Sequence, residues 1–257
     1  MNVVVLGSGT SSGVPTIGCP CDVCHSSDPR DNRTRPSVLI EYQGRNIIID
    51  TTPDFRAQVL REHVSHVDAI LFTHAHADHI LGFDDIRPFN AIQRSRIPVY
   101  ASEDTLDALR RIFSYVFDNV DRNTFIPQID THDHAGQPFD LFGLKVQPIP
   151  LLHGAQPIYG YRIGAFAYLT DHSSIPEPSM ELLQGLDVLF LDALRYRPHP
   201  THSTVETALC NIARLQPKRA YFTHICHDLP HGATEAALPP NIRLAYDGLR
   251  VTVEDDL

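Results

Sequence analysis

The chain is predicted to fold as a layered α/β sandwich with two mixed sheets, because several strand patterns are followed by isolated helical patterns. Short aliphatic and β-branched runs alternate with helix-like periodicity over most of the 257 residues. Hydrophobic residues make up 42% and charged residues 20% of the chain, which is typical of a soluble globular protein. No internal repeat or long Pro/Gly-rich linker divides the sequence, so residues 1–257 are expected to form a single domain.

Each expected strand is an apolar run bounded by turn residues. In chain order these runs are 3–7, 37–42, 46–50, 69–73, 98–102, 144–150, 159–163, 166–170, 187–192 and 219–223. Helices are expected at 54–62, 104–117, 177–184 and 203–215. Ser203 and Glu206 stand at capping-box spacing at the start of the last helix, and Gly44 and Gly143 mark hairpin turns.

Net charge and hydrophobic pattern indicate which partners and which cellular compartment are expected. The formal net charge of −10 argues against a nucleic-acid partner, because proteins that bind phosphate backbones gather Lys and Arg. No apolar run approaches the roughly 20 residues that a membrane span needs, so no membrane partner is expected. The start "MNVVVLGSG" lacks a basic region and is interpreted as a first strand and not as a signal peptide, which favours a cytoplasmic protein with reduced cysteines.

A glycine cluster, "GSGTSSG" at 7–13, follows the first expected strand and raises the alternative of dinucleotide binding. Its spacing is G-x-G-x-x-x-G and not G-x-G-x-x-G, and no helical pattern follows it. A tight polar turn is therefore favoured over a cofactor site.

The motif "THAHADH" at 73–79 crowds four candidate metal ligands into six positions after the apolar run "AILF". His74 and His76 point to the same side of an extended segment, because side chains alternate along it. A turn after them can bring Asp78 and His79 to a neighbouring metal. A solvated loop with accidental histidines is the weaker alternative. Further candidates each follow an apolar run, where α/β sheets present functional side chains; these are His153, Asp171 and His224.

Together these residues resemble the metallo-β-lactamase superfamily, whose fold is an αββα sandwich. The resemblance implies a dinuclear centre in which Asp171 bridges both metals. It assigns to the first metal His74, His76 and His153, and to the second Asp78, His79 and His224. Two divalent ions about 3.5–4 Å apart would share a water and lower its pKa, so that a metal-bound hydroxide attacks the substrate. The mixed N/O ligand set suits Zn²⁺, Mn²⁺ or Fe²⁺, and two Zn or Mn ions are expected.

Three of the five cysteines, Cys19, Cys21 and Cys24, fall within six positions in "IGCPCDVCH". Reduced thiolates at this density usually hold a metal, and a closed zinc site needs a fourth ligand. His227 in "THICH" is the favoured fourth ligand, since it would join this loop to the one that carries His224. A structural zinc beside the dinuclear centre is therefore expected. The alternative fourth ligands are His25 and Cys226.

The pairing of "GCPCDVC" with "THICH", and "TRPSVLIE" before the second strand, resemble the PhnP-type phosphodiesterases. This resemblance implies hydrolysis of a small phosphate diester, such as a ribosyl or nucleotide cyclic phosphate. His202 matches a histidine that contacts substrate phosphate in those enzymes, and "HST" also resembles the proton-donating motif of tRNase Z. His202, as general acid or phosphate contact, and Asp78 are the candidate catalytic residues. For His202 the alternative is a helix N-terminal residue without a chemical role.

Other functions stay open. A tRNase Z-like RNA processor would explain "HST", but the net charge of −10 and the lack of a basic insertion count against it. A PqqB-like protein shares the C-x-C-x-x-C run, and the superfamily also hosts lactone and thioester hydrolysis. A non-catalytic metal-binding module is a further alternative.

The stretch 104–134 contains no motif that matches these families. Its aromatic residues could line a pocket, form the face of a homodimer or pack into the core, which is favoured for any single one; they are Phe113, Tyr115 and Phe117.

Several other residues are not assigned to the centre. His132 and His134 imitate H-x-H but lack the following D-H. Arg195 and Arg197 could help to bind phosphate, although nothing in their spacing requires it. Cys210, on an expected helix, is expected to be a buried thiol.

Overall fold

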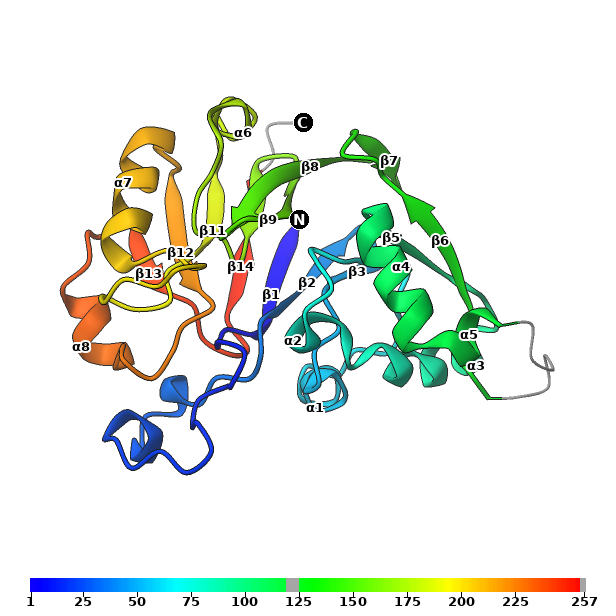
Figure 1. Ribbon diagram of the computed structural model, residues 1–257, viewed down its shortest axis with the longest axis horizontal. Helices are drawn as coiled ribbons and strands as arrows, with labels where there is room; N and C mark the ends of the chain where they lie inside the picture. Colours follow the sequence, from blue (N-terminus) through cyan, green and yellow to red (C-terminus); the bar gives the residue numbers. More distant parts are fainter. Residues whose placement is uncertain (119–124, 255–257) are drawn as a thin grey trace.

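The computed structural model describes residues 1–118 and 125–254, which form two seven-stranded sheets (Figure 1). The first sheet has the strand order β14-β1-β2-β3-β4-β5-β6 and the second the order β13-β12-β11-β10-β9-β8-β7. The strands are β1 Asn2–Gly7, β2 Ser37–Tyr42, β3 Arg45–Ile49, β4 Ala69–Leu71, β5 Ile97–Ala101, β6 Ile129–Asp133, β7 Phe139–Leu141, β8 Leu144–His153, β9 Gln156–Ile163, β10 Phe166–Leu169, β11 Val188–Asp192, β12 Arg219–Thr223, β13 Ile242–Leu244 and β14 Arg250–Thr252. The helices are α1 Phe55–Arg61, α2 Ala77–Ile80, α3 Arg87–Gln93, α4 Glu103–Ile112, α5 Ser114–Phe117, α6 Glu177–Glu181, α7 Val205–Leu215 and α8 His231–Ala236, with short 3₁₀ turns η1 Val23–His25, η2 Pro29–Asp31 and η3 Phe83–Ile86.

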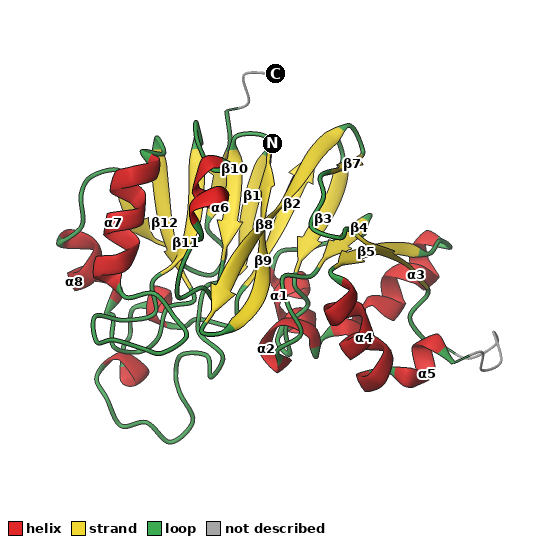
Figure 2. Cartoon of the chain, turned by 45° about the horizontal axis from the view of Figure 1, so that its top comes forward, coloured by secondary structure: helices red, strands yellow, loops and turns green. Residues whose placement is uncertain are grey.

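The two sheets pack against each other, and helices cover their outer faces (Figures 1 and 2). Alternation along β11 shows how one strand serves two layers, because successive side chains point to opposite faces. Val188 and Phe190 belong to the apolar core between the sheets, whereas Leu189 and Leu191 pack in the core under α6 and α7. A third core lies between the first sheet and helices α1 to α4. This order of layers confirms the αββα sandwich.

Parallel pairing brings the ends of several strands to one edge of the molecule. β10, β11 and β12 are parallel, so the residues at or just past their ends, Asp171, Asp192 and His224, meet there. β3 and β4 are also parallel and lead to Asp50 and His74. Loops gather below the sheets in Figure 2, and this edge is where an α/β protein places its functional side chains.

Both predicted hairpin turns are present. Gln43 and Gly44 join β2 to β3, and Phe142 and Gly143 join β7 to β8. All four residues have positive φ, from 48° to 84°, as a two-residue turn with the hairpin's twist requires.

The prediction of one continuous helix over 104–117 is wrong. This segment divides into α4 and α5 at Phe113, whose φ of −111° and ψ of 43° are not helical. The Phe113 ring is buried and packs edge-on against Phe83, with ring centroids 5.2 Å apart, so core packing determines the break. Phe117 packs against the same core, whereas Tyr115 is 39% exposed and its hydroxyl donates to Asp84.

The helix cap and the cysteine predicted on α7 are also corrected. The cap is Thr204, whose Oγ1 accepts from the backbone N–H of Thr207 at 3.1 Å, and not Ser203, whose hydroxyl donates to the carbonyl of His172. Cys210 is exposed and not buried. The buried positions of α7 follow a 3-4-3 spacing that leaves Cys210 on the opposite face; they are Val205, Ala208, Ile212 and Leu215.

Several short elements were not predicted. β7, β13 and β14 have three residues each, and the edge strand β6, "IDTHD", is mostly polar, so none shows an apolar run. In residues 1–118 and 125–254, no helix has the length and apolarity needed to cross a membrane.

Candidate metal centre

The predicted ligands converge from separate parts of the chain. The extended residues after β4 carry His74 and His76, and the first turn of α2 carries Asp78 and His79. The remaining ligands come from the other sheet, where they lie at the end of β8 and just past β10 and β12; they are His153, Asp171 and His224. The structure therefore brings all seven side chains to the shared edge of the two sheets.

One set of four ligand atoms surrounds a common point. The Nε2 of His79 lies 3.2 Å from Oδ1 of Asp171 and 3.4 Å from Oδ2 of Asp78. The Nε2 of His224 lies 3.1 Å from Oδ2 of Asp171 and 3.7 Å from Oδ2 of Asp78. All four atoms lie within 4.8 Å of one another, which is the spacing of ligands around one cation.

The other histidines form a second set beside this one. The ring centroids of His74 and His76 are 4.5 Å apart, and that of His153 lies 5.8 Å and 5.0 Å from them. A ligand atom of Asp171 also lies within 4.8 Å of one of His153. Asp171 therefore lies between the two sets, where a carboxylate could reach a cation on either side.

The donor atoms fit divalent cations. Four of them are buried without a hydrogen-bond partner, namely Nε2 of His74, His79 and His224 and Oδ2 of Asp78. Buried polar atoms in this state are costly unless a ligand satisfies them. Burial alone would lower the pKa of His224, but Asp171 and its neighbours raise that pKa to about 10, so the site attracts positive charge. An N/O set of this kind suits Zn²⁺ or Mn²⁺.

Asp50, which the sequence analysis missed, orients the ligands His79 and His74 through hydrogen bonds. It is fully buried, and its Oδ2 accepts from Nδ1 of His79 at 2.8 Å. It also accepts from the backbone N–H and hydroxyl of Thr73, whose Oγ1 lies 3.0 Å from Nδ1 of His74. Such contacts fix the ring tautomers so that Nε2 faces the centre. The signal was present, since Asp50 ends an apolar run as Asp171 does.

The backbone is strained at this edge. Asp50, Asp171 and His224 all have left-handed conformations, with φ of 65°, 60° and 57°. Such conformations cost roughly 1–3 kcal/mol each and cluster at functional sites. The turn at Asp171 directs its carbonyl to Nδ1 of His153, which donates to it at 2.5 Å.

His202 lies beside the centre and pairs with Asp192, a second residue that the sequence analysis missed. Nδ1 of His202 lies 2.7 Å from Oδ2 of Asp192, the last residue of β11. The His202 ring lies 4.7 Å from that of His153 and stacks on His224 at 4.5 Å. Burial lowers the pKa of His202 to about 3 and raises the pKa of Asp192 to about 7. Burial therefore favours the neutral form of each group.

The three clustered cysteines lie around the ring of His227. Nδ1 of His227 lies 3.2, 3.6 and 3.4 Å from the sulfurs of Cys19, Cys21 and Cys24. These distances match the edges of a tetrahedron with ligand bonds of about 2.0–2.3 Å. The two alternative ligands lie elsewhere: His25 is exposed with its ring at the Cys21 carbonyl, and the Cys226 sulfur accepts from the N–H of Asp228.

A buried arginine joins the cysteine loop to the loop that carries His227. Arg33 is 1% exposed and donates to the carbonyls of Cys226 and Leu229 at 2.9 and 2.7 Å. It also pairs with Asp31 at 2.9 Å, whose carboxylate accepts from the N–H of His231. The guanidinium of Arg33 therefore hydrogen-bonds to the backbone on both sides of His227.

The other residues singled out in the sequence lie away from the centre or are already paired. Arg197 is exposed and pairs with Asp228 at 2.8 Å. His132 is exposed and stacks on Tyr100, whereas His134 is buried and accepts from the N–H of Gly136.

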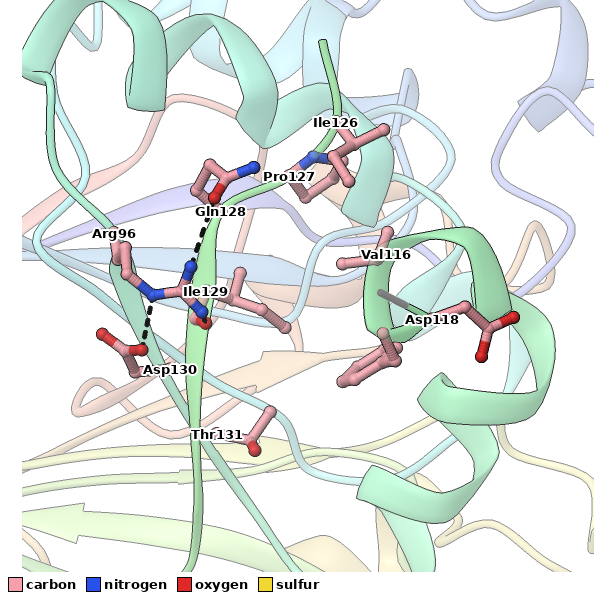
Figure 3. A pocket seen from close by; sticks show the side chains of 10 residues that line it. Arg96, Val116, Asp118, Ile126, Pro127, Gln128, Ile129, Asp130 and Thr131 are labelled. Carbon is pink, nitrogen blue, oxygen red and sulfur yellow. Dashed lines mark hydrogen bonds and ion pairs between the residues drawn. The ribbon is translucent and has the colours of Figure 1, made fainter. Parts of the chain in front are cut away.

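A cavity of about 400 Å³ lies between α5 and β6, at the far edge of the first sheet (Figure 3). Val116 and Thr131 line it, and Arg96 at its rim pairs with Asp130 at 2.6 Å. None of the metal ligands predicted from the sequence is among the described residues that line this cavity.

Comparisons with known proteins identify the family and the fold of the chain. The family model of the beta-lactamase superfamily domain matches residues 45–225. A crystal structure described as a new diphosphatase from the PhnP family is 53% identical, with a TM-score of 0.93 over 98% of both chains. Zinc-bound PqqB from Methylobacterium extorquens shares the fold, with a TM-score of 0.82 at 20% identity over 98% of this chain and 100% of that one.

A curated relative adds a further similarity. The octanoyltransferase of Porphyromonas gingivalis is 39% identical over 99% of this chain. The chain spans about half the length of that relative, 52%. Since the family model covers well over half of the sequence, the chain belongs to the beta-lactamase superfamily.

Proposed function

We propose that the chain hydrolyses a small disubstituted phosphate, either a phosphate diester or a disubstituted diphosphate, at a dinuclear metal centre. The observation that carries the proposal is the convergence of the seven predicted N/O ligands beside the His202–Asp192 pair. His74, His76 and His153 would hold one ion, Asp78, His79 and His224 the other, and Asp171 would contact both. Two divalent ions there would lower the pKa of a shared water and polarise a phosphoryl oxygen.

The protein's own groups supply the rest of the chemistry. His202 is held by Asp192 at Nδ1, which leaves Nε2 available for contact with a substrate. From there it can donate a proton to the oxygen that leaves phosphorus. Asp78 would act through the metal that it helps to hold, and Asp50 would keep His79 and His74 oriented.

The substrate class follows from the phosphorus centre. A phosphate diester and each phosphorus of a disubstituted diphosphate carry two bridging oxygens and one negative charge. One site can therefore act on both classes, which include cyclic ribosyl and nucleotide phosphates. The 53% identity to a diphosphatase of the PhnP family supports this class, and the net charge of −10 disfavours an RNA substrate.

The cysteine cluster has a separate role in this proposal. Cys19, Cys21, Cys24 and His227 would hold a structural zinc with all four positions occupied by protein. Such a site stabilises the loop and offers no open position for substrate.

A second candidate function is hydrolysis of an acyl thioester. The observation that favours it is the 39% identity to a protein named as an octanoyltransferase, although this chain matches only about half of that protein. The fold of this superfamily supports more than one kind of hydrolysis.

One substrate panel tests both functions. Protein loaded with Mn²⁺ or Zn²⁺ is given bis(p-nitrophenyl) phosphate, p-nitrophenyl phosphate and an octanoyl thioester, with His74→Ala as the control. Turnover of the diester alone, lost in His74→Ala, supports the phosphodiesterase proposal. Turnover of the thioester alone refutes it and supports the acyl candidate.

A further inference from the structure

The segment Pro198–His199–Pro200 places a second histidine beside His202. The two prolines restrict the backbone on both sides of His199. Arg195 secures the same turn by donating to the carbonyls of Arg197 and Pro198 at 3.2 and 3.0 Å. His199 is therefore held on a loop with little conformational freedom.

The hydrogen bonds of His199 determine which nitrogen faces outward. Its Nδ1 accepts from the backbone N–H of Thr201 at 3.3 Å, and the Thr201 hydroxyl lies at the same distance. A backbone N–H can only donate, so Nδ1 is the acceptor and the proton of the neutral ring is on Nε2. Burial, with the nearby His202 and Arg195, lowers the pKa of His199, which keeps the ring neutral. Within the described residues this Nε2 has no hydrogen-bond partner, and the side chain is partly exposed.

The position of His199 relates it to the reaction. Its ring centroid lies 5.0 Å from that of His202, whose own ring stacks on the ligand His224 at 4.5 Å. The Thr201 methyl packs beside Gly154, where an added Cβ would approach it to 3.0 Å, so the loop is fixed against the residue that follows His153. A donor whose ring lies 5.0 Å from that of His202 is within reach of the group next to a phosphorus that His202 contacts. The guanidinium of Arg195 adds positive charge near the same place.

We propose that His199 donates its Nε2–H to the second phosphoryl group of a disubstituted diphosphate and so selects diphosphates over simple phosphate diesters. The inference rests on the proposed function and narrows its substrate class. In the reaction, water oxygen bonds to the phosphorus nearest His202 and the bond from that phosphorus to the bridging oxygen breaks. The bridging oxygen leaves with the electron pair on the second phosphate, taking a proton from His202, which regains one from the attacking water. The products are two phosphate monoesters.

A matched pair of substrates tests the role of His199. P1,P2-diphenyl diphosphate and diphenyl phosphate carry the same substituents and differ in the second phosphoryl group. His199→Ala should lower kcat/KM for the diphosphate by about ten- to a hundredfold, the worth of one hydrogen bond to a charged acceptor, and change it less than threefold for the diester. His199→Gln, which retains an N–H donor, should recover part of the loss. His132→Ala, which replaces an exposed histidine on β6, should leave kcat/KM unchanged for both substrates.

A binding measurement gives a readout independent of turnover. Calorimetric titration with methylenediphosphonate should show the same loss of affinity in His199→Ala, and titration with methylphosphonate should show none. Equal loss on both substrates, or no loss on either, would overturn the role of His199. Turnover of diphenyl phosphate without any turnover of the diphosphate would also overturn it while leaving the proposed function intact. Wild-type protein that hydrolyses neither compound would refute the proposed function itself.

Discussion

Replacing Asp192 by Asn tests whether His202 acts as an acid. The substitution keeps the shape of the side chain but replaces the carboxyl group that lies 2.7 Å from Nδ1 of His202 by an amide that cannot ionise. Asp192 is fully buried and the His202 side chain is 11% exposed, so solvent compensates little for the loss. A hydrogen bond to a charged group contributes about 1.5–3 kcal/mol. Since about 1.4 kcal/mol corresponds to a tenfold change in rate, kcat should fall by about 10- to 150-fold.

The leaving group distinguishes an acid from a merely structural residue. Diphenyl phosphate needs protonation of its leaving oxygen, whereas bis(p-nitrophenyl) phosphate releases a stable anion and needs little. The fall in Asp192→Asn should therefore be large on the first substrate and small on the second. Asp187→Asn is the matched control, because Asp187 is equally buried next to the same strand and pairs with Arg219 at 2.6 Å, far from His202. Equal losses on both substrates, with metal content unchanged, would refute the role of His202 as the acid.

Three further predictions concern the support of the two metal sites. Asp50→Ala removes the acceptor of His79 and should weaken metal binding at the dinuclear centre by about 10- to 100-fold in a metal titration, whereas Asp68→Ala, in an ion pair before β4, should not. His227→Ala should remove one zinc per chain by elemental analysis and lower Tm, and an unchanged zinc content would contradict the Cys₃His site. Arg33→Met removes the cation that pairs with Asp31 and the donor to the carbonyls of Cys226 and Leu229 in the interior, so the free energy of unfolding in urea should fall by about 3–5 kcal/mol; a loss below about 1 kcal/mol would contradict the role of Arg33 as the anchor of this loop.

The sequence predicted those parts of the molecule that depend on local patterns. Residues His153, Asp171 and His224 could be found because each follows an apolar run, and parallel pairing brings such positions together. Asp50 and Asp192 follow the same rule but were missed, because a pattern cannot distinguish a ligand from the residue that orients it. Only the folded distances make that distinction.

The errors arose where tertiary packing overrides local preference. Phe113 leaves the helix because its ring fills the core beside Phe83. Cys210 was expected inside because thiols are usually buried, but its place on α7 turns it toward solvent. The edge strand β6 has too few apolar residues to be recognised from the sequence.

The most direct test of the central claim is to count metal ions and measure turnover on the same samples. Purified wild-type protein and His74→Ala are reconstituted with Mn²⁺ and Zn²⁺, analysed for metals by mass spectrometry, and assayed with bis(p-nitrophenyl) phosphate. The account predicts three ions per chain in the wild type, two at the dinuclear centre and one zinc at the cysteines, with diester turnover. His74→Ala should keep the zinc, lose an ion from the centre and lose turnover. Full turnover in a protein that holds only the cysteine-bound zinc would contradict the account.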